Sequence, residues 1–204
     1  MKKYELTAEF IEKWGKKLFR IKALISFGSV EAGELGGYVE KEDNLAQTGN
    51  AWVSGDARVY GDAWVSGNAW VSGNARVYGN ARVYGDAEVY GDARVCGDAR
   101  VYGDARVYGD ARVCGDARVC GDAWVSGDAW VSGDADYLLI GRIGSRFSFT
   151  TFFKNKDKGI TVSCGCFLGT IAEFRAKVTD THGNNKHAKM YNLAADMAEL
   201  QILG

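Results

Sequence analysis

The residues of this sequence that could do chemistry return at fixed places in a six-residue unit, as in "GDARVYGDARVYGDARVC" (97–114). Guanidinium groups bind carboxylates and phosphates, and aromatic rings pair with cations or stack on flat ligands. The pattern therefore predicts a binding surface for an anionic ligand or an acidic protein. Its candidate residues are Arg58, Arg76, Arg82, Arg94, Arg100, Arg106, Arg112 and Arg118, with Tyr60, Tyr78, Tyr84, Tyr102 and Tyr108.

Five of the six tryptophans lie in the same repeats and gather toward the two ends of the repeated region. Five exposed indoles are unusual for a monomer, and interfaces concentrate Trp and Arg. We therefore expect an oligomer or partner interface formed by Trp52, Trp64, Trp70, Trp124 and Trp130.

A second group of reactive side chains follows the repeats. Cys164 and Cys166, with His182 and His187, offer four ligands of the kind that zinc binds. The C-x-C spacing is tighter than usual, and the simpler interpretation is two small residues at a strand end and a histidine near a helix C-terminus. We therefore predict no metal and no cofactor.

The repeat that positions the Arg, Tyr and Trp side chains reads G-[DN]-A-[RWE]-V-[YSC] fourteen times between Gly49 and Ser132. Glycine in every unit excludes a helix. Each unit is instead a short extended piece, with Val inward and its neighbours outward, followed by a tight Gly-Asp or Gly-Asn corner. Single units cannot bury a core, so they must coil and stack at about 4.8 Å.

This repeat resembles the hexapeptide repeat of left-handed parallel β-helices, in which three hexads form one 18-residue coil. The resemblance implies the left-handed twist and the three sides. The best-known enzymes of that family are acyltransferases that use acyl-CoA, usually as trimers with a histidine as general base. The two histidines here lie outside the repeats, and no loop interrupts fourteen hexads. Catalysis is therefore disfavoured, and an acyltransferase is kept as the alternative to a homo-oligomeric binding scaffold, with a trimer implied by the resemblance.

Stacking by 18 residues predicts ladders of like side chains. Arg58, Arg76, Arg94 and Arg112 would form one, Arg82, Arg100 and Arg118 a second, and Trp52, Trp70, Glu88, Arg106 and Trp124 a third. Like charges one strand apart repel each other. Either tyrosines and corner aspartates compensate the arginines, or an anionic partner does. Residues 49–135, which include the start of a fifteenth unit, carry eleven Asp and one Glu against eight Arg, so their net charge of −4 disfavours nucleic acid as the partner.

Cys96 and Cys114 are also 18 residues apart and should stack in consecutive coils. The geometry would allow a disulfide. Free thiols are the favoured interpretation for a chain without secretory features.

The whole chain is predicted to be mainly β, a left-handed parallel β-helix over 36–135 with a β cap at 1–35 and an α+β module at 136–204. Residues 36–53 should add nearly one coil, with Val39 and Leu45 inward and a two-residue insertion before Val53. Residues 7–14 could be a helical turn instead of a strand. In the last module we expect a hairpin over 147–165, one helix from Thr170 and a second over about 186–202.

The N-terminus lacks the apolar segment of a signal peptide, and no apolar run is long enough to span a membrane, so a soluble cytoplasmic protein is expected. The arrangement of "GELGGYVEKEDNLAQTGNAWV", uniform hexads and "CGCFLGTIAEF" also resembles uncharacterised hexapeptide-repeat proteins of bacteria and phages. That resemblance implies a phage accessory protein in the host cytoplasm that binds a host factor, such as a defence component or its nucleotide signal.

Overall fold

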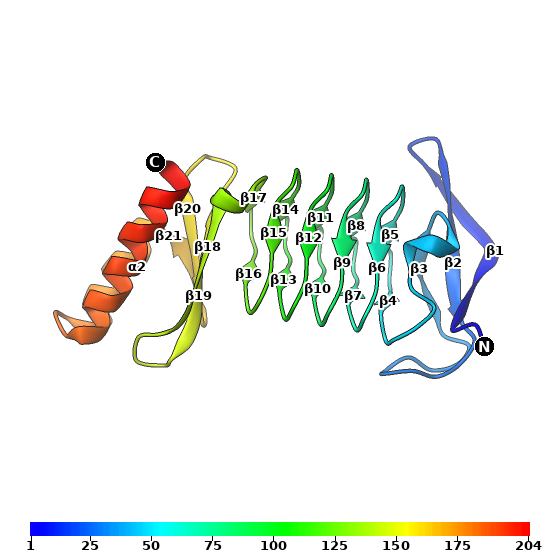
Figure 1. The fold of residues 1–204 in the computed structure, drawn as a ribbon, viewed down its shortest axis with the longest axis horizontal. Coiled ribbons are helices and arrows are strands. Elements are labelled where there is room, and N and C mark those ends of the chain that lie inside the picture. The colour runs from blue at the N-terminus through cyan, green and yellow to red at the C-terminus, as the bar shows by residue number, and fades with distance from the viewer.

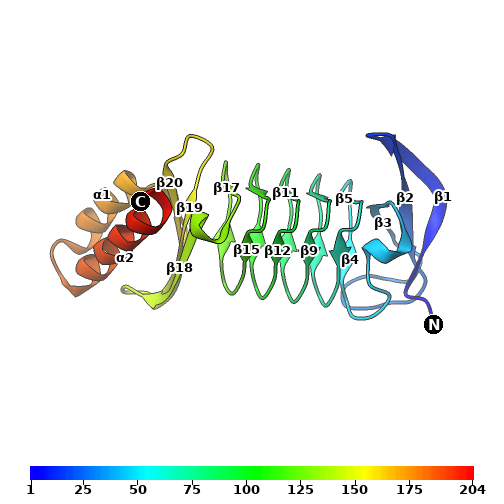
Figure 2. The same cartoon turned by 45° about the horizontal axis from the view of Figure 1, so that its top comes forward.

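The protein is a rod whose centre is a β-solenoid of about five turns, as the computed structural model of residues 1–204 shows (Figure 1). An N-terminal hairpin closes one end. A four-stranded antiparallel sheet and two helices lie at the other end (Figure 2). None of the helices combines the length and the apolar content needed to cross a membrane.

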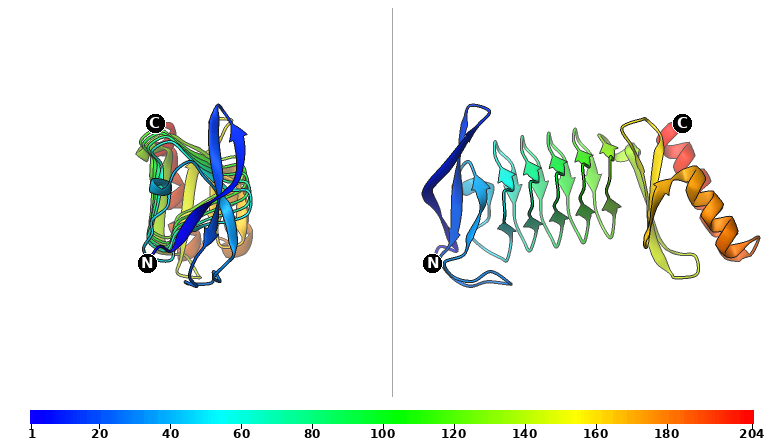
Figure 3. Two further views of the ribbon diagram at one scale, coloured as in Figure 1. Left: turned by 90° about the vertical axis from the view of Figure 1, so that its right-hand side faces the viewer. Right: turned by 180° about the vertical axis from the view of Figure 1, so that it is seen from behind.

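The coils have three faces of short parallel strands, and coils that follow one another superimpose in the end-on view (Figure 3). Each residue pairs with the one 18 positions away, as Arg94 does with Arg76 and Arg112. The 18-residue, three-sided coil is thereby confirmed, and its left-handedness stays a prediction. The first face contains β5 (Arg58–Val59), β8 (Arg76–Val77), β11 (Arg94–Val95), β14 (Arg112–Val113) and β17 (Trp130–Val131). The second contains β6 (Trp64–Val65), β9 (Arg82–Val83), β12 (Arg100–Val101) and β15 (Arg118–Val119). The third contains β4 (Trp52–Val53), β7 (Trp70–Val71), β10 (Glu88–Val89), β13 (Arg106–Val107) and β16 (Trp124–Val125).

Two residue types of the repeat build the core and a third builds the corners. Every Val and Ala of the repeat is buried, with at most 1 % of its surface exposed. The corner glycines up to Gly127 have positive φ, such as +74° at Gly85, where a Cβ would lie 2.9 Å from the backbone nitrogen of Gly103. Only glycine avoids both the strain and the collision, so the period of six follows from corner sterics.

A partial coil precedes the regular ones, as the sequence predicts. Strand β3 (Leu35–Val39) pairs in parallel with β5, and Val39 faces Val59. Leu45 forms an isolated bridge with Val65 after the short 3-10 helix η1 (Glu42–Asn44). The two partners of each of these pairs are 20 residues apart in the sequence, whereas Val53 and its partner Val71 are 18 apart. The two-residue insertion therefore lies between Leu45 and Val53.

The N-terminal cap is an antiparallel hairpin of β1 (Tyr4–Lys13) and β2 (Lys16–Ala23). Residues 7–14 are therefore extended up to Lys13, and the helical alternative is wrong. Strand β2 pairs with β3, so the hairpin continues the sheet of the first face.

The two ends of the solenoid need opposite hydrogen-bonding groups, because each coil donates N–H groups to the coil that follows. The first coil therefore presents carbonyl oxygens without a preceding donor. Lys3 donates to the carbonyl of Ala51 at 2.8 Å, and Asn44 donates to the carbonyl of Ala63 at 2.8 Å. Both side chains are buried, so the cap supplies donors where a coil would have supplied them.

At the last coil the unpaired groups are N–H donors, and the side chains there are acceptors. Thr151 Oγ1 accepts from the backbone N–H of Trp124 at 3.0 Å. Asp136 Oδ2 accepts from the backbone N–H of Ser132 at 2.8 Å, and its other oxygen accepts from Lys154 at 3.0 Å.

The C-terminal sheet lies between the coils and the helices. After the 3-10 helix η2 (Asp134–Asp136) it contains β18 (Tyr137–Ile143), β19 (Ser148–Lys154), β20 (Ile160–Cys164) and β21 (Phe167–Thr170). Phe153 of β19 joins the solenoid core, while its neighbour Phe152 joins the core beneath the helices. Consecutive strand residues point to opposite faces, so one strand connects both cores. The hairpin of β19 and β20 is confirmed, and β21 is a strand that the sequence interpretation missed.

The two predicted helices are confirmed as α1 (Ile171–His182) and α2 (Lys186–Leu203). Thr170 and Glu173 form the expected capping box at the start of α1, and Gly183 caps its end. The buried side of α2 contains the residues that its spacing predicts: Tyr191, Ala194, Ala195, Ala198 and Ile202.

Candidate binding faces of the solenoid

Arginines form in-register ladders on two faces. On the second face Arg100 pairs with Arg82 and Arg118, and on the first face Arg94 pairs with Arg76 and Arg112. Parallel pairing places identical positions of neighbouring coils about 4.8 Å apart, so guanidinium groups line up along the rod.

Corner aspartates do not neutralise these ladders. Arg106 is the only repeat arginine with a carboxylate inside salt-bridge distance, and its partner is Glu88 of its own ladder at 3.4 Å. The alternative in which corner aspartates compensate the arginines thus gains no support from direct ion pairs. Corner side chains stack on the next corner instead, as Asn68 does when it donates to Asp86 at 2.9 Å.

The tyrosines stack on each other rather than beneath arginines. Ring centroids are 5.1 Å apart for Tyr60 and Tyr78, and 5.0 Å apart for Tyr84 and Tyr102. Register brings like side chains together across strands, and this correction to the expected Arg–Tyr contacts follows from that register. Tyr90, which the sequence interpretation left out of the candidate residues, stacks on Tyr108 at 4.9 Å. Burial and the neighbouring Tyr78 raise the pKa of Tyr60.

Arginines of the repeat instead lie over indoles. The Arg76 guanidinium is 5.0 Å from the ring centroid of Trp14, which comes from the N-terminal hairpin and also stacks on Tyr60. Arg106 and Arg112 lie over Trp124 and Trp130 at 5.3 and 5.6 Å.

The second face therefore carries the most accessible arginines. Arg82, Arg100 and Arg118 are exposed, and they have neither a carboxylate nor an indole partner. On the first face Arg58, Arg76 and Arg94 are half-buried, and Trp14 covers part of that ladder. Arg112 at its end is exposed, but its guanidinium lies over Trp130. The structure thus separates two ladders that look alike in the sequence.

The tryptophans differ strongly in exposure. Trp64, Trp124 and Trp130 expose 41 %, 36 % and 46 % of their surface, and Trp70 is half-buried. Trp52 is fully buried, and the rings of Tyr4 and Phe27 meet it edge-on. The expectation that Trp52 is exposed at an interface is therefore wrong, because the N-terminal cap covers the first coil.

Cys96 and Cys114 form a disulfide across consecutive coils of the first face. The ladder holds their Cα atoms 4.6 Å apart, within the range that a disulfide spans. The preference for free thiols at these two positions is therefore wrong, and Cys120, Cys164 and Cys166 are the free cysteines.

The four candidate zinc ligands do not come together. Cys164 and Cys166 line a cavity of about 240 Å³ beside α1, together with His182. His187 does not line this cavity, although its ring centroid lies 5.9 Å from that of His182. No group of three or more His, Cys, Asp or Glu side chains is placed to hold a metal ion. Cys164 accepts a hydrogen bond from Thr150 Oγ1 at 3.2 Å.

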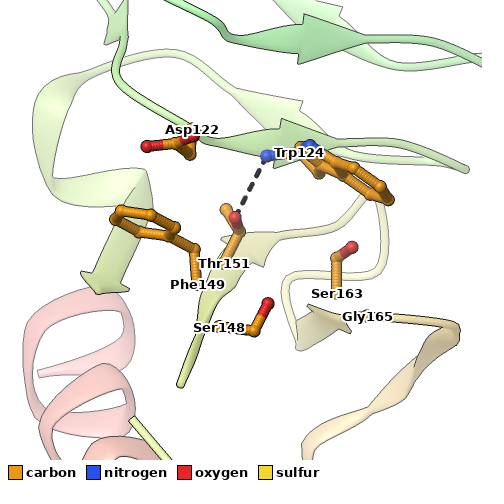
Figure 4. Close-up of a pocket in the computed structure, with 7 residues that line it drawn as sticks. All are labelled: Asp122, Trp124, Ser148, Phe149, Thr151, Ser163 and Gly165. Atoms are coloured by element: carbon orange, nitrogen blue, oxygen red, sulfur yellow. Dashed lines mark hydrogen bonds between the residues drawn. The ribbon is translucent and has the colours of Figure 1, made fainter. Parts of the chain in front are cut away.

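A smaller cavity of about 170 Å³ lies between the last coil and the sheet (Figure 4). Its wall includes Trp124 and Phe149 with three hydroxyl side chains, and Figure 4 shows the Thr151 hydroxyl directed at the backbone nitrogen of Trp124. The hydroxyl of Thr151 serves to close the coil, so this cavity is part of the joint between solenoid and sheet.

The repeated region is similar to the family described as YdcK beta solenoid repeat. The matched residues are 51–67, 57–73, 69–85, 75–91, 93–109, 99–115, 105–121, 111–127 and 117–133. A comparison with curated proteins gives no match. The repeat match and the coil geometry agree on a β-solenoid repeat protein.

Proposed function

We propose that this β-solenoid is a binding scaffold whose second face docks an acidic ridge on a partner protein. The observation that carries the proposal is the ladder of Arg82, Arg100 and Arg118, which is exposed, in register and without any partner in the chain. Three like charges one strand apart cost free energy, and a partner that supplies carboxylates relieves that cost.

The spacing and rigidity of the ladder support a protein partner. The backbone beneath the arginines is held by ladder hydrogen bonds, such as that from Arg82 N–H to the Ala99 carbonyl at 2.9 Å. The guanidinium groups are therefore presented at a repeat of about 4.8 Å, the distance at which neighbouring strands of a partner would present carboxylates. Little backbone ordering is needed on binding, which lowers its entropic cost.

The surroundings of the ladder limit what can bind. Rows of corner residues flank it on both sides, with Asp98 and Asp116 on one side and Asp86 and Asp104 on the other, all exposed. The face therefore carries a positive stripe between two largely negative ones. A narrow acidic ridge fits this pattern, whereas a long nucleic acid would meet the flanking carboxylates and the net charge of −4.

Aromatic residues complete the surface. Trp64 at one end of the ladder is 41 % exposed, and the stacked Tyr84 and Tyr102 run beside the arginines. Exposed Trp, Tyr and Arg are the residues that dominate protein interfaces. The resemblance to phage hexapeptide-repeat proteins makes host proteins the class of partner to screen. No feature of the coil faces favours the acyltransferase alternative.

The test compares two triple variants with the same change in net charge. Arg82→Gln/Arg100→Gln/Arg118→Gln removes the second-face ladder, and Arg58→Gln/Arg76→Gln/Arg94→Gln removes three of the four arginines of the first-face ladder. The probe is a fluorescent poly-glutamate peptide, followed by anisotropy over a salt series. We expect the second-face variant to bind about tenfold or more weakly and the first-face variant to bind as the wild type does.

Three results would overturn the proposal. One is the absence of poly-glutamate binding by the wild type. Another is an equal loss in both variants, since that would show a response to net charge alone. The third is tighter binding of single-stranded DNA than of poly-glutamate, which would assign the face to a nucleic acid.

A further inference from the structure

Helix α2 has apolar residues on both sides. Its buried side is mostly alanine, with Ala188, Ala194, Ala195 and Ala198 against the sheet. Its outward side carries the larger apolar residues: Met190, Leu193, Met197, Leu200 and Leu203 expose 40 %, 63 %, 57 %, 78 % and 54 % of their surface. A contiguous stripe of large exposed apolar side chains on a surface helix marks an interaction site, so we infer that a partner covers this side.

The neighbouring helix α1 shows that an exposed apolar surface is not a general property of the C-terminal module. The exposed positions of α1 include Glu173, Lys177 and Asp180, and its apolar Phe174 and Val178 are buried. Helix α1 is thus an ordinary surface helix, and the apolar surface belongs to α2 alone.

The spacing of the exposed residues indicates what kind of partner fits. Met190, Leu193, Met197 and Leu200 are separated by three, four and three positions, which is the seam of a coiled coil. This spacing reads the same in both directions. Two copies related by a two-fold axis between Leu193 and Met197 would therefore match residue for residue in antiparallel orientation.

Charge supports the same arrangement. The first half of α2 carries Lys186 and Lys189, which make no ion pair within the chain, and the second half carries Asp196 and Glu199. Arg175 holds both acids, at 2.7 and 2.8 Å, but Asp196 remains 62 % exposed. An antiparallel pair brings the basic half of each helix to the acidic half of the other, whereas a parallel pair brings like charges together.

We propose that α2 is a homodimer interface, in which two copies pair their α2 helices antiparallel through the Met190–Leu193–Met197–Leu200 seam. The helices lie at the outer end of the rod, so the dimer joins two rods end to end (Figure 1). The second-face arginine ladder of each copy stays free in this arrangement. The dimer differs from the trimer that the acyltransferase resemblance implies, and it does not depend on the proposed function.

Sedimentation equilibrium of the full chain tests the proposal. We expect wild-type protein to be a dimer and Leu193→Gln/Leu200→Gln to dissociate at least about a hundredfold more readily, because each dimer loses four buried leucines. Gln is a good helix former, so far-UV circular dichroism should be unchanged. Leu168→Gln is the matched control, since Leu168 is 50 % exposed on β21 of the same module, and it should dimerise as the wild type does.

A second variant tests the orientation without touching the seam. Lys189→Gln should raise the dissociation constant about two- to tenfold, and less at high salt, if Lys189 faces the acidic half of the other copy. In a parallel pair the same change removes a repulsion and leaves the dimer equal or tighter. Small-angle scattering should give a maximal dimension close to twice that of the monomeric variant.

The proposal is wrong if the wild type is monomeric at every concentration or is a trimer. It is equally wrong if the Leu193→Gln/Leu200→Gln dimer is as tight as the wild type, or if the two rods lie side by side. A monomer that binds anionic vesicles through α2 would assign this face to a membrane and would also overturn it.

Discussion

The ammonium group of Lys3 donates a hydrogen bond to the carbonyl oxygen of Ala51 at 2.8 Å across 48 residues of sequence. It takes the place of the backbone N–H that a preceding coil would have offered. The side chain is 2 % exposed, and its ammonium also lies 4.9 Å from the ring centroid of Phe27. Lys3 thus supplies one of the hydrogen-bond donors that close this end of the solenoid, and Asn44 supplies another.

Lys3 should make stability depend on pH in an alkaline window. Burial lowers its pKa to about 8. The unfolded chain releases this proton only near pH ~10.4, so the folded state binds fewer protons between these values. The free energy of unfolding should therefore rise with pH across that window. Urea unfolding of wild type and Lys3→Met at several pH values measures this. The variant should lack the rise, and an identical pH dependence in both would contradict the assignment.

Asp136 should stabilise the joint between the last coil and the sheet. Burial raises the pKa of its carboxyl, but hydrogen bonds from Ser132 and the charge of Lys154 outweigh that effect and hold the pKa below its usual range. The contribution of Asp136 to the free energy of unfolding is therefore complete above the pKa of the unfolded chain, about 3.9. It is lost as the pH falls through the lower pKa of the folded state. We expect Asp136→Asn to cost about 1–3 kcal/mol at neutral pH.

The measurement for Asp136 is chemical denaturation at neutral and acid pH. The difference between wild type and Asp136→Asn should shrink in acid. Asp104→Asn, at an exposed corner, is the control and should change stability by less than about 0.5 kcal/mol. Equal effects of the two substitutions would show that the carboxylate contacts of Asp136 contribute nothing.

Corner glycines should be required for two separable reasons. Gly85 has φ +74°, and an added Cβ would lie 2.9 Å from the Gly103 nitrogen. Gly15 has φ +72° with nothing within 4 Å of an added Cβ. Gly15→Ala thus reports the conformational cost alone, about 1 kcal/mol, and Gly85→Ala should cost clearly more. Thermal unfolding of both variants compares them, and similar losses would mean that neighbouring corners move apart at little cost.

The Cys96–Cys114 disulfide should stabilise the solenoid under oxidising conditions. Closing a loop of this length lowers the conformational entropy of the unfolded chain, which raises the free energy of unfolding by about 3 kcal/mol. Cys96→Ser/Cys114→Ser should therefore unfold at lower denaturant concentration than untreated wild type, and reductant should bring the wild type to the same midpoint. Cys166→Ser, at an exposed free thiol, serves as the control. If the denaturation midpoint of the wild type were the same with and without reductant, the presence of this disulfide would be contradicted.

The local structure of the repeat region could be predicted closely because the residue types within each unit define its conformation. Gly and Asp or Asn define a corner, and Ala and Val define the inward side, so the six-residue unit could be predicted without any distant contact. The grouping of three units into an 18-residue coil came from the resemblance to the hexapeptide-repeat family, because the repeat is too uniform to show that period itself. The helices α1 and α2 could also be predicted from local signals, because capping residues and the spacing of apolar residues indicate them. Strand β21 was not predicted because "FLGT" lacks a clear alternation of apolar and polar residues. It is a strand only through its pairing with β20.

The candidate site could be predicted only in part. Sequence spacing places Arg82, Arg100 and Arg118 on one ladder, and pairing confirms it. It places Arg58, Arg76, Arg94 and Arg112 on another, which pairing also confirms. It could not show that Trp14, far away in the sequence, covers the first face. The same 18-residue spacing relates Tyr84 to Tyr102, and the structure corrects the expected contacts between arginines and tyrosines to stacks of tyrosine rings.

The sequence by itself determined the inward side and the corners of each six-residue unit, because these depend on steric rules that act within a few residues. The three sides of the coil were implied by the resemblance to hexapeptide-repeat proteins. Only the tertiary structure decided which arginines stay accessible, why Trp52 is buried and how each end of the rod is closed. Those outcomes depend on contacts between segments far apart in the chain, such as Lys3 with Ala51 and Thr151 with Trp124. No local pattern specifies such contacts, because the groups that they satisfy become unpaired only when the stack of coils ends.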